Sequence, residues 1–202
     1  MAARRDPEDK IIDAALRLAA SRGWSGLSLA EIAKSAKVGL PALSVLFGSK
    51  GEILAAFSRR IDAEVLKAAS AEDLADEVAR DRLFDVLMMR FDALTPHKPA
   101  LKRIAQDLRR DPVAAAGLMR PMLQSLGWML EAAGIDSSGL AGAVRVRGLA
   151  LVWGAAFRIW LDDGDDQAKT MAELDRRLRG GEAFLERLNN FGRRRREADE
   201  AA

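Results

Sequence analysis

Residues 28 to 50 are the most informative segment of this chain and read Ser-Leu-Ala-Glu-Ile-Ala-Lys-Ser-Ala-Lys-Val-Gly-Leu-Pro-Ala-Leu-Ser-Val-Leu-Phe-Gly-Ser-Lys. The segment opens with Ser-x-x-Glu, a capping box in which serine and glutamate side chains satisfy free amides at a helix start. Apolar residues then recur at helical spacing in two short runs, over 29–36 and 40–47. Two short helices joined by a tight turn are typical of a helix-turn-helix, which places its second helix in the major groove of DNA.

The flanking sequence carries further helix signals. Residues 6–7 are Asp-Pro, an N-cap followed by proline at the first helical position. A second capping box stands at 49–52, Asp-Pro recurs at 111–112, and two prolines indicate a loop over 95–99. Strand signals are weak throughout, so the sequence predicts an all-α protein.

The helix predicted after the second capping box connects two parts of the chain. Its inward residues are Ile53, Leu54, Phe57, Ile61 and Val65, and a further cap signal begins at Ser70. We therefore expect a three-helix N-terminal DNA-binding domain over 1–67, a larger helical domain over 68–191 and a disordered tail over 192–202.

Composition limits the class of protein. Hydrophobic residues make up 49% and charged residues 31% of the 202 residues, which is typical of a globular protein. The net charge of +2 excludes a general polycation. The N-terminus lacks the apolar region of a signal peptide, and the longest apolar stretch is about half of the roughly 20 residues that cross a membrane. We expect a cytoplasmic protein without a membrane span.

Residues for catalysis or metal binding are few. No cysteine is present, and His97 is the single histidine, which the flanking prolines place in an exposed loop. The acidic run over 162–166 lacks the spacing of a calcium loop. Nucleophile-elbow, phosphate-loop and HExxH motifs are absent from the sequence. The sequence therefore predicts no enzyme, no metal site and no cofactor.

Capping, turn and core residues stand at many fixed offsets in the first third of the chain, namely Ile12, Asp13, Ala14, Ala15, Gly23, Leu29 to Ala33, Ala36, Val38, Leu43, Phe47 and Ser49 to Leu54. In this pattern residues 1–67 resemble the TetR family of bacterial transcriptional regulators. The resemblance implies a homodimeric repressor whose N-terminal domain binds a palindromic operator in double-stranded DNA. It also implies that the C-terminal domain holds a small apolar effector and forms the dimer interface, which we expect mainly from residues 139–191.

The resemblance assigns DNA contacts to particular residues. The segment 39–47 matches the recognition helix, Ser28 matches a phosphate-touching cap, and Lys50 matches a lysine that approaches the DNA backbone. Two arginines near the N-terminus match an arm that reaches the minor groove. The predicted DNA-binding residues are Arg4, Arg5, Ser28, Lys37, Gly39, Leu40, Pro41, Ala42, Ser44 and Lys50.

Four positions of the helix-turn-helix depart from the family pattern. Family members usually carry tyrosine where this chain has Ser44, and histidine or tyrosine where it has Leu46. They usually have glycine at Lys37 and serine at Gly39. A lysine in a left-handed turn costs on the order of 1 kcal/mol, and it adds a positive charge near the expected DNA face.

Large apolar residues of the C-terminal part are candidates for an effector pocket, since aromatic and methionine surfaces adapt to apolar ligands. The same residues also fit a packed core or a dimer seam, which residue by residue is the favoured interpretation, and the sequence leaves both open. The predicted ligand-binding residues are Leu87, Phe91, Met122, Trp128, Trp153 and Phe157.

A second resemblance covers about 30 residues near the C-terminus. The pieces Trp160-Leu161-Asp162-Asp163 and Leu174-Asp175-Arg176-Arg177-Leu178 look like the closing segment of the coenzyme Q biosynthesis lipid-binding proteins, which share the TetR-like fold. This similarity implies an alternative function, that of a lipid-binding accessory protein that has lost DNA binding.

Overall fold

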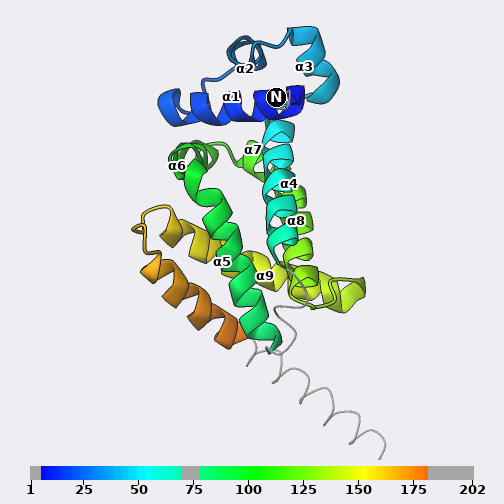
Figure 1. Cartoon of the computed structure of the whole chain (residues 1–202), viewed down its shortest axis with the longest axis vertical. Coiled ribbons are helices and arrows are strands. Elements are labelled where there is room, and N and C mark those ends of the chain that lie inside the picture. The colour runs from blue at the N-terminus through cyan, green and yellow to red at the C-terminus, as the bar shows by residue number, and fades with distance from the viewer. Residues whose placement is uncertain (1–5, 70–77, 182–202) are drawn as a thin grey trace, which may run out of the picture.

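The structure is a computed structural model that describes residues 6–69 and 78–181. Within these two ranges every regular element is a helix, which confirms the all-α prediction (Figure 1). The helices are α1 (Pro7–Arg22), α2 (Leu29–Ala36), α3 (Leu40–Leu46), α4 (Lys50–Ala68), α5 (Ala79–Leu94), the 3-10 helix Thr95–His97, α6 (Lys98–Leu108), α7 (Pro112–Gly117), α8 (Met119–Ala132) and α9 (Gly139–Trp160). A further helix covers 168–181.

Helices α1, α2 and α3 form one end of the molecule (Figure 1). The Asp6 side chain accepts the Glu8 amide at 3.2 Å and starts α1, as its Asp-Pro signal predicts. The apolar face of α1 packs against α2, α4 and α6. Ile12, Ile32 and Leu43 are almost completely buried where these helices meet.

Helix α4 connects this end to the rest of the protein. It begins after Ser49, whose side chain accepts the Glu52 amide at 3.2 Å. The Glu52 carboxylate accepts the Gly48 amide at 2.9 Å in place of the Ser49 amide, so the predicted capping box is half formed. It then packs against α5 and α8, and its residues Ile61 and Val65 are buried there. The predicted boundary near residue 67 lies in the last turn of α4 and stays a prediction.

The segment 95–99 is not the loop that its prolines suggested. Thr95–His97 form a 3-10 helix that runs directly into α6, because Pro96 and Pro99 each stand at a helix start, where proline has no amide to lose. The His97 ring is half-buried and meets the Phe57 ring edge-on, with centroids 4.9 Å apart. Its predicted exposure is therefore wrong.

A break separates α7 from α8 at Leu118, three residues before Pro121. Leu118 ends α7, and Pro121 lies in the first turn of α8 without interrupting a helical hydrogen bond. The chain then ends α8 near Gly134, whose positive φ of 70° lets the backbone reverse.

Helix α9 is the longest of the described helices. Among these helices, α9 is the one continuous helix that is long and apolar enough to cross a membrane. Core helices of globular proteins meet the same criterion, and on its inward side Trp153 and Trp160 are buried. The acidic turn after α9 is structural, since the Asp163 side chain accepts the Thr170 amide at 2.7 Å and so starts the helix 168–181.

Several sequence predictions fall outside the described ranges. They concern the minor-groove arm with Arg4 and Arg5, the cap at 70–73, and the tail over 192–202.

Candidate nucleic-acid interface

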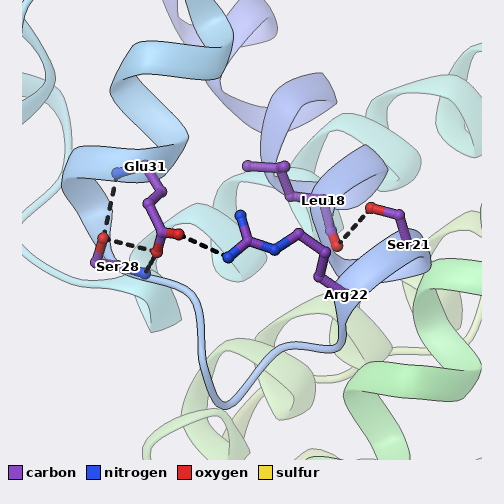
Figure 2. A network of polar contacts seen from close by, with 5 residues as sticks. All are labelled: Leu18, Ser21, Arg22, Ser28 and Glu31. Carbon is purple, nitrogen blue, oxygen red and sulfur yellow. Dashed lines mark hydrogen bonds and ion pairs between the residues drawn. The ribbon is translucent and has the colours of Figure 1, made fainter.

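Helix α2 is fixed at its start by a complete capping box. The Ser28 hydroxyl accepts the Glu31 amide at 3.2 Å, and the Glu31 carboxylate accepts the Ser28 amide at 3.0 Å (Figure 2). Arg22 at the end of α1 donates to the other Glu31 oxygen at 2.8 Å. These hydrogen bonds lower the pKa of Glu31 to about 2, so the carboxylate is charged at neutral pH and ties α1 to α2.

The turn after α2 is a Schellman motif with a lysine at its left-handed position. Val38 donates its amide to Ala33 at 3.0 Å, and Lys37 donates its amide to Lys34 at 3.2 Å. Lys37 has φ 56° and ψ 39°, as the turn requires. The structure thus confirms the strained conformation expected at Lys37 and leaves its side chain exposed.

Helix α3 is held by two apolar anchors and is otherwise open. Leu43 is 0% exposed and Phe47 is 3% exposed, and both join the core under α1. The remaining side chains of α3 are exposed, including Val45 at 85%. The Ser44 hydroxyl donates back to the Pro41 carbonyl at 2.8 Å. At the outer end of the molecule α3 therefore presents a convex surface that a groove of DNA can accept (Figure 1).

The predicted DNA residues do not all lie in this exposed surface. Ser28 is exposed at the start of α2. The turn and α3 bring together six further predicted residues, namely Lys37, Gly39, Leu40, Pro41, Ala42 and Ser44. Lys50 is half-buried instead. Its amine donates to the carbonyls of Trp24 at 2.9 Å and Ser25 at 3.2 Å and lies 5.3 Å from the centre of the Trp24 ring. Its predicted contact with the DNA backbone stays a prediction.

Asp107 holds the same loop from the other side. Its carboxylate accepts the amides of Trp24 at 2.6 Å and Ser25 at 2.9 Å, and these two bonds lower its pKa. Because Asp107 belongs to α6 and Lys50 to α4, the loop between α1 and α2 is clamped between the two parts of the molecule. A groove of about 520 Å³ adjoins this clamp, with an apolar wall that includes Leu54, Leu108, Leu118 and Pro121.

The predicted ligand residues are packed rather than gathered around that groove. Phe91 stacks on Trp153 with ring centroids 4.5 Å apart, and Trp153 and Phe157 lie 5.9 Å apart. Leu87 is fully buried and Met122 is half-buried, while Trp128 is 51% exposed on the surface of α8. The six residues therefore form no single surface, and their role in effector binding stays a prediction.

A buried charged cluster lies beside these rings and was not predicted. The Arg90 guanidinium pairs with the Asp62 carboxylate, and both side chains are more than nine-tenths buried. Ser125 donates to Asp62 at 2.7 Å, and the guanidinium lies 5.2 Å from the Trp153 ring centre. The cluster joins α4, α5, α8 and α9. A signal was present in the sequence, because Arg90 stands at the helical spacing of Leu83 and Leu87 on the apolar face of α5.

The comparisons with known proteins agree with this geometry. Residues 11–57 match the family described as bacterial regulatory proteins, tetR family. A TetR transcriptional regulator from Nitrosomonas europaea is similar in structure with a TM-score of 0.68 and 24% identity, covering 86% of this chain and 96% of that chain. A TetR transcriptional regulator from Rhodococcus sp. RHA1 gives a TM-score of 0.65 at 20% identity, covering 85% and 93% of the two chains.

No curated protein matches the chain in sequence. The two structural likenesses fall below 25% identity and establish the shared fold, while the match over 11–57 covers the helix-turn-helix itself. The chain therefore carries a helix-turn-helix of the tetR family over residues 11–57 and shares the fold of TetR regulators over most of its length.

Proposed function

We propose that the protein is a ligand-responsive, dimeric repressor that binds a palindromic operator. The observation that carries the proposal is the exposed helix α3, locked at its start by the α2 cap and turn and at its base by Leu43 and Phe47. A rigid element of this kind inserts into a major groove without paying further ordering entropy. Two copies bind two half-sites when their α3 helices lie about 34–36 Å apart.

The dimer in this proposal forms through α9. Leu140, Val144 and Leu151 are 86%, 51% and 76% exposed and recur at helical spacing along one side of the helix. Gly148 and Gly154 stand on the same exposed side, where their lack of a side chain permits two helices to approach closely. Met171 adds a 43% exposed apolar side chain on the helix 168–181. The exposed Arg147 and Arg158 interrupt this apolar stripe on the same side of α9. Exposed apolar side chains gathered along one helix side are typical of a subunit interface.

The response to an apolar effector runs through α6 in this proposal. A ligand changes an equilibrium only by its different affinity for the two states. Asp107 connects α6 to the loop before α2, so an effector that favours a shifted α6 also favours a shifted helix-turn-helix. Which residues contact the effector stays a hypothesis in this scheme. The candidates are Leu87, Phe91, Met122, Trp128, Trp153 and Phe157.

The test is a selection of genomic fragments by the purified protein, followed by sequencing. The proposal expects a shared palindrome in the retained fragments and an affinity that falls steeply with salt, because phosphate contacts release counterions. Lys37→Gln should flatten the salt dependence, whereas Lys169→Gln, an exposed change on the helix 168–181, should leave it unchanged. Failure to retain any fragment at low salt contradicts the proposal.

The alternative function is that of a TetR-fold lipid-binding accessory protein. It is favoured by the apolar character of α3, in which Ser44 is the sole side chain that can form a hydrogen bond. Under this alternative the protein co-purifies with isoprenoid lipid and retains no DNA at low salt. Mass spectrometry of an organic extract of the purified protein distinguishes the two functions.

A further inference from the structure

Helix α3 offers DNA an almost entirely apolar face. Residues of an α-helix follow one another at about 100°, so Pro41 and Val45 lie opposite the buried Leu43. Ala42 and Ser44 lie about 100° to either side of Leu43. Leu40 and Leu46 flank this face and are 48% and 40% exposed, while Val45 at the centre is 85% exposed. We call Leu40, Pro41, Ala42, Val45 and Leu46 the apolar face of α3.

The polar side chain of α3 contributes little to base recognition. Ser44 is exposed, but its hydroxyl proton is donated to the Pro41 carbonyl at 2.8 Å. The hydroxyl therefore has lone pairs to accept a hydrogen bond and no proton to give. Guanine presents two acceptors in the major groove and is read by donors such as arginine or lysine. The apolar face of α3 supplies none.

Two exposed lysines beside α3 are placed to meet the DNA backbone and not the bases. Lys34 is exposed on α2 and Lys37 is exposed in the turn. In a helix-turn-helix the first helix crosses the DNA backbone, and the early residues of the second helix contact base edges. Lysines on α2 and in the turn therefore add affinity through phosphates, and such contacts carry no direct sequence information.

One feature of the major groove matches an apolar helix face. Thymine projects a C5-methyl group into the groove, and apolar side chains recognise it by contact. We infer that α3 reads methyl groups, so that the operator half-sites place thymine, or 5-methylcytosine, under the apolar face of α3. This inference rests on the proposed function and names the DNA chemistry that the same site selects.

The test uses the operator found by fragment selection, in four versions of one duplex. At one thymine under α3 in each half-site, the base is kept, changed to deoxyuridine, changed to cytosine, or changed to 5-methylcytosine paired with guanine. Deoxyuridine removes the methyl group alone. Burial of one such group is worth about fourfold in affinity, so the symmetric deoxyuridine operator should bind roughly 15-fold more weakly. The 5-methylcytosine operator should bind more tightly than the cytosine operator.

A protein variant assigns the effect to α3. Val45→Ser removes apolar surface from a side chain that is 85% exposed, so the fold should tolerate it, and the thymine-to-deoxyuridine affinity ratio should fall at least twofold. Val113→Ser is the matched control on α7, where the side chain is 82% exposed, and it should leave the ratio unchanged. A Val45→Ser ratio equal to that of the unmodified protein overturns the assignment.

The outcomes separate this inference from the function on which it rests. Equal binding of the thymine and deoxyuridine operators, within twofold, overturns methyl recognition and leaves a regulator that reads DNA by other means. Failure to retain any genomic fragment overturns the regulator and methyl recognition together. Deoxyuridine placed between the half-sites, away from α3, should have no effect, and a loss there also contradicts the inference.

Discussion

The Asp107 carboxylate at the end of α6 accepts the backbone amide of Trp24 at 2.6 Å and so joins α6 to the loop that leads into α2. The Lys50 amine on α4 donates to the carbonyl oxygen of the same residue, Trp24, at 2.9 Å. The two charged groups act on opposite ends of one backbone segment. The two hydrogen bonds therefore tie the loop before α2 to α6 and to α4 together.

Asp107→Ala should loosen this connection. The loss of two hydrogen bonds to this half-buried, ionised acceptor should lower the free energy of unfolding by about 1 kcal/mol. Since the bonds lower the pKa of Asp107, their contribution is present above the ordinary aspartate pKa and is lost as the pH falls through the lowered value. Urea denaturation at pH 7 and at acidic pH measures the difference. Asp165→Asn, at an exposed carboxylate, is the control, and an equal loss in both variants contradicts the role of Asp107.

Lys37→Gly should stabilise the protein and weaken its affinity for DNA. Glycine adopts φ 56° without strain, so the free energy of unfolding should rise by up to about 1 kcal/mol. The greater conformational entropy of glycine in the unfolded chain reduces this gain. If Lys37 contacts one phosphate, the slope of log affinity against log salt should fall by about 0.9. Lys37→Asn, which also tolerates the left-handed region, is the companion variant. A destabilised Lys37→Gly protein would contradict the strain.

The parts of the structure that the sequence predicted are those that depend on local signals. The α2 capping box joins residues three apart, and the left-handed conformation of Lys37 follows from its position after α2. The contacts of Lys50 were not predictable in the same way, because its partners lie 25 and 26 residues away. Proline signals at 95–99 were ambiguous, since proline favours a helix start as well as a loop.

The packing of the aromatic residues also depends on the tertiary structure. Periodicity indicates that Phe91 and Trp153 face inward, but the choice between a pocket and a core depends on how α5 and α9 meet. The pair Asp62–Arg90 depends on the meeting of α4 and α5 in the same way. Asp62 and Arg90 lie on different helices, 28 residues apart, so the pattern of either helix by itself does not reveal the pair.

Glu31→Gln should change the acid stability of the protein. The pKa of Glu31 is lowered from 4.5 to about 2, so its charged form stabilises the fold above pH 4.5, and this contribution is lost as the pH falls toward 2. Glu31→Gln should therefore be less stable than the unmodified protein at pH 6, and the difference should shrink at pH 3. Thermal unfolding at both pH values measures it. A difference that does not depend on pH contradicts this role of the charge.

Arg90→Met should be strongly destabilising. It leaves the Asp62 carboxylate buried without its cation, a change that typically costs about 3–5 kcal/mol. The double variant Asp62→Leu with Arg90→Met removes both charges and should recover much of that loss. Urea denaturation of the unmodified protein, of Asp62→Leu and Arg90→Met singly, and of the double variant measures the coupling. If the double variant is as unstable as the sum of the single changes, the pair is not energetically coupled.

Leu151→Glu should dissociate the proposed dimer. The side chain is 76% exposed on α9, so the monomer should keep its fold, but a charge in the apolar stripe opposes burial between two subunits. Analytical ultracentrifugation should give half the mass of the unmodified protein. Val113→Glu on α7, with an 82% exposed side chain, should not change the mass. An unaltered dimer with Leu151→Glu places the interface elsewhere.

The presentation of α3 to DNA is tested most directly by Val45→Glu in a gel-shift titration with the selected operator. The change puts a negative charge at the centre of the exposed face without touching the core, since Val45 is 85% exposed. Our account predicts that the unmodified protein shifts the operator at low salt and that Val45→Glu abolishes the shift while the circular dichroism and unfolding midpoint stay the same. Equal shifts by both proteins would contradict the assignment of α3 as the DNA-reading helix.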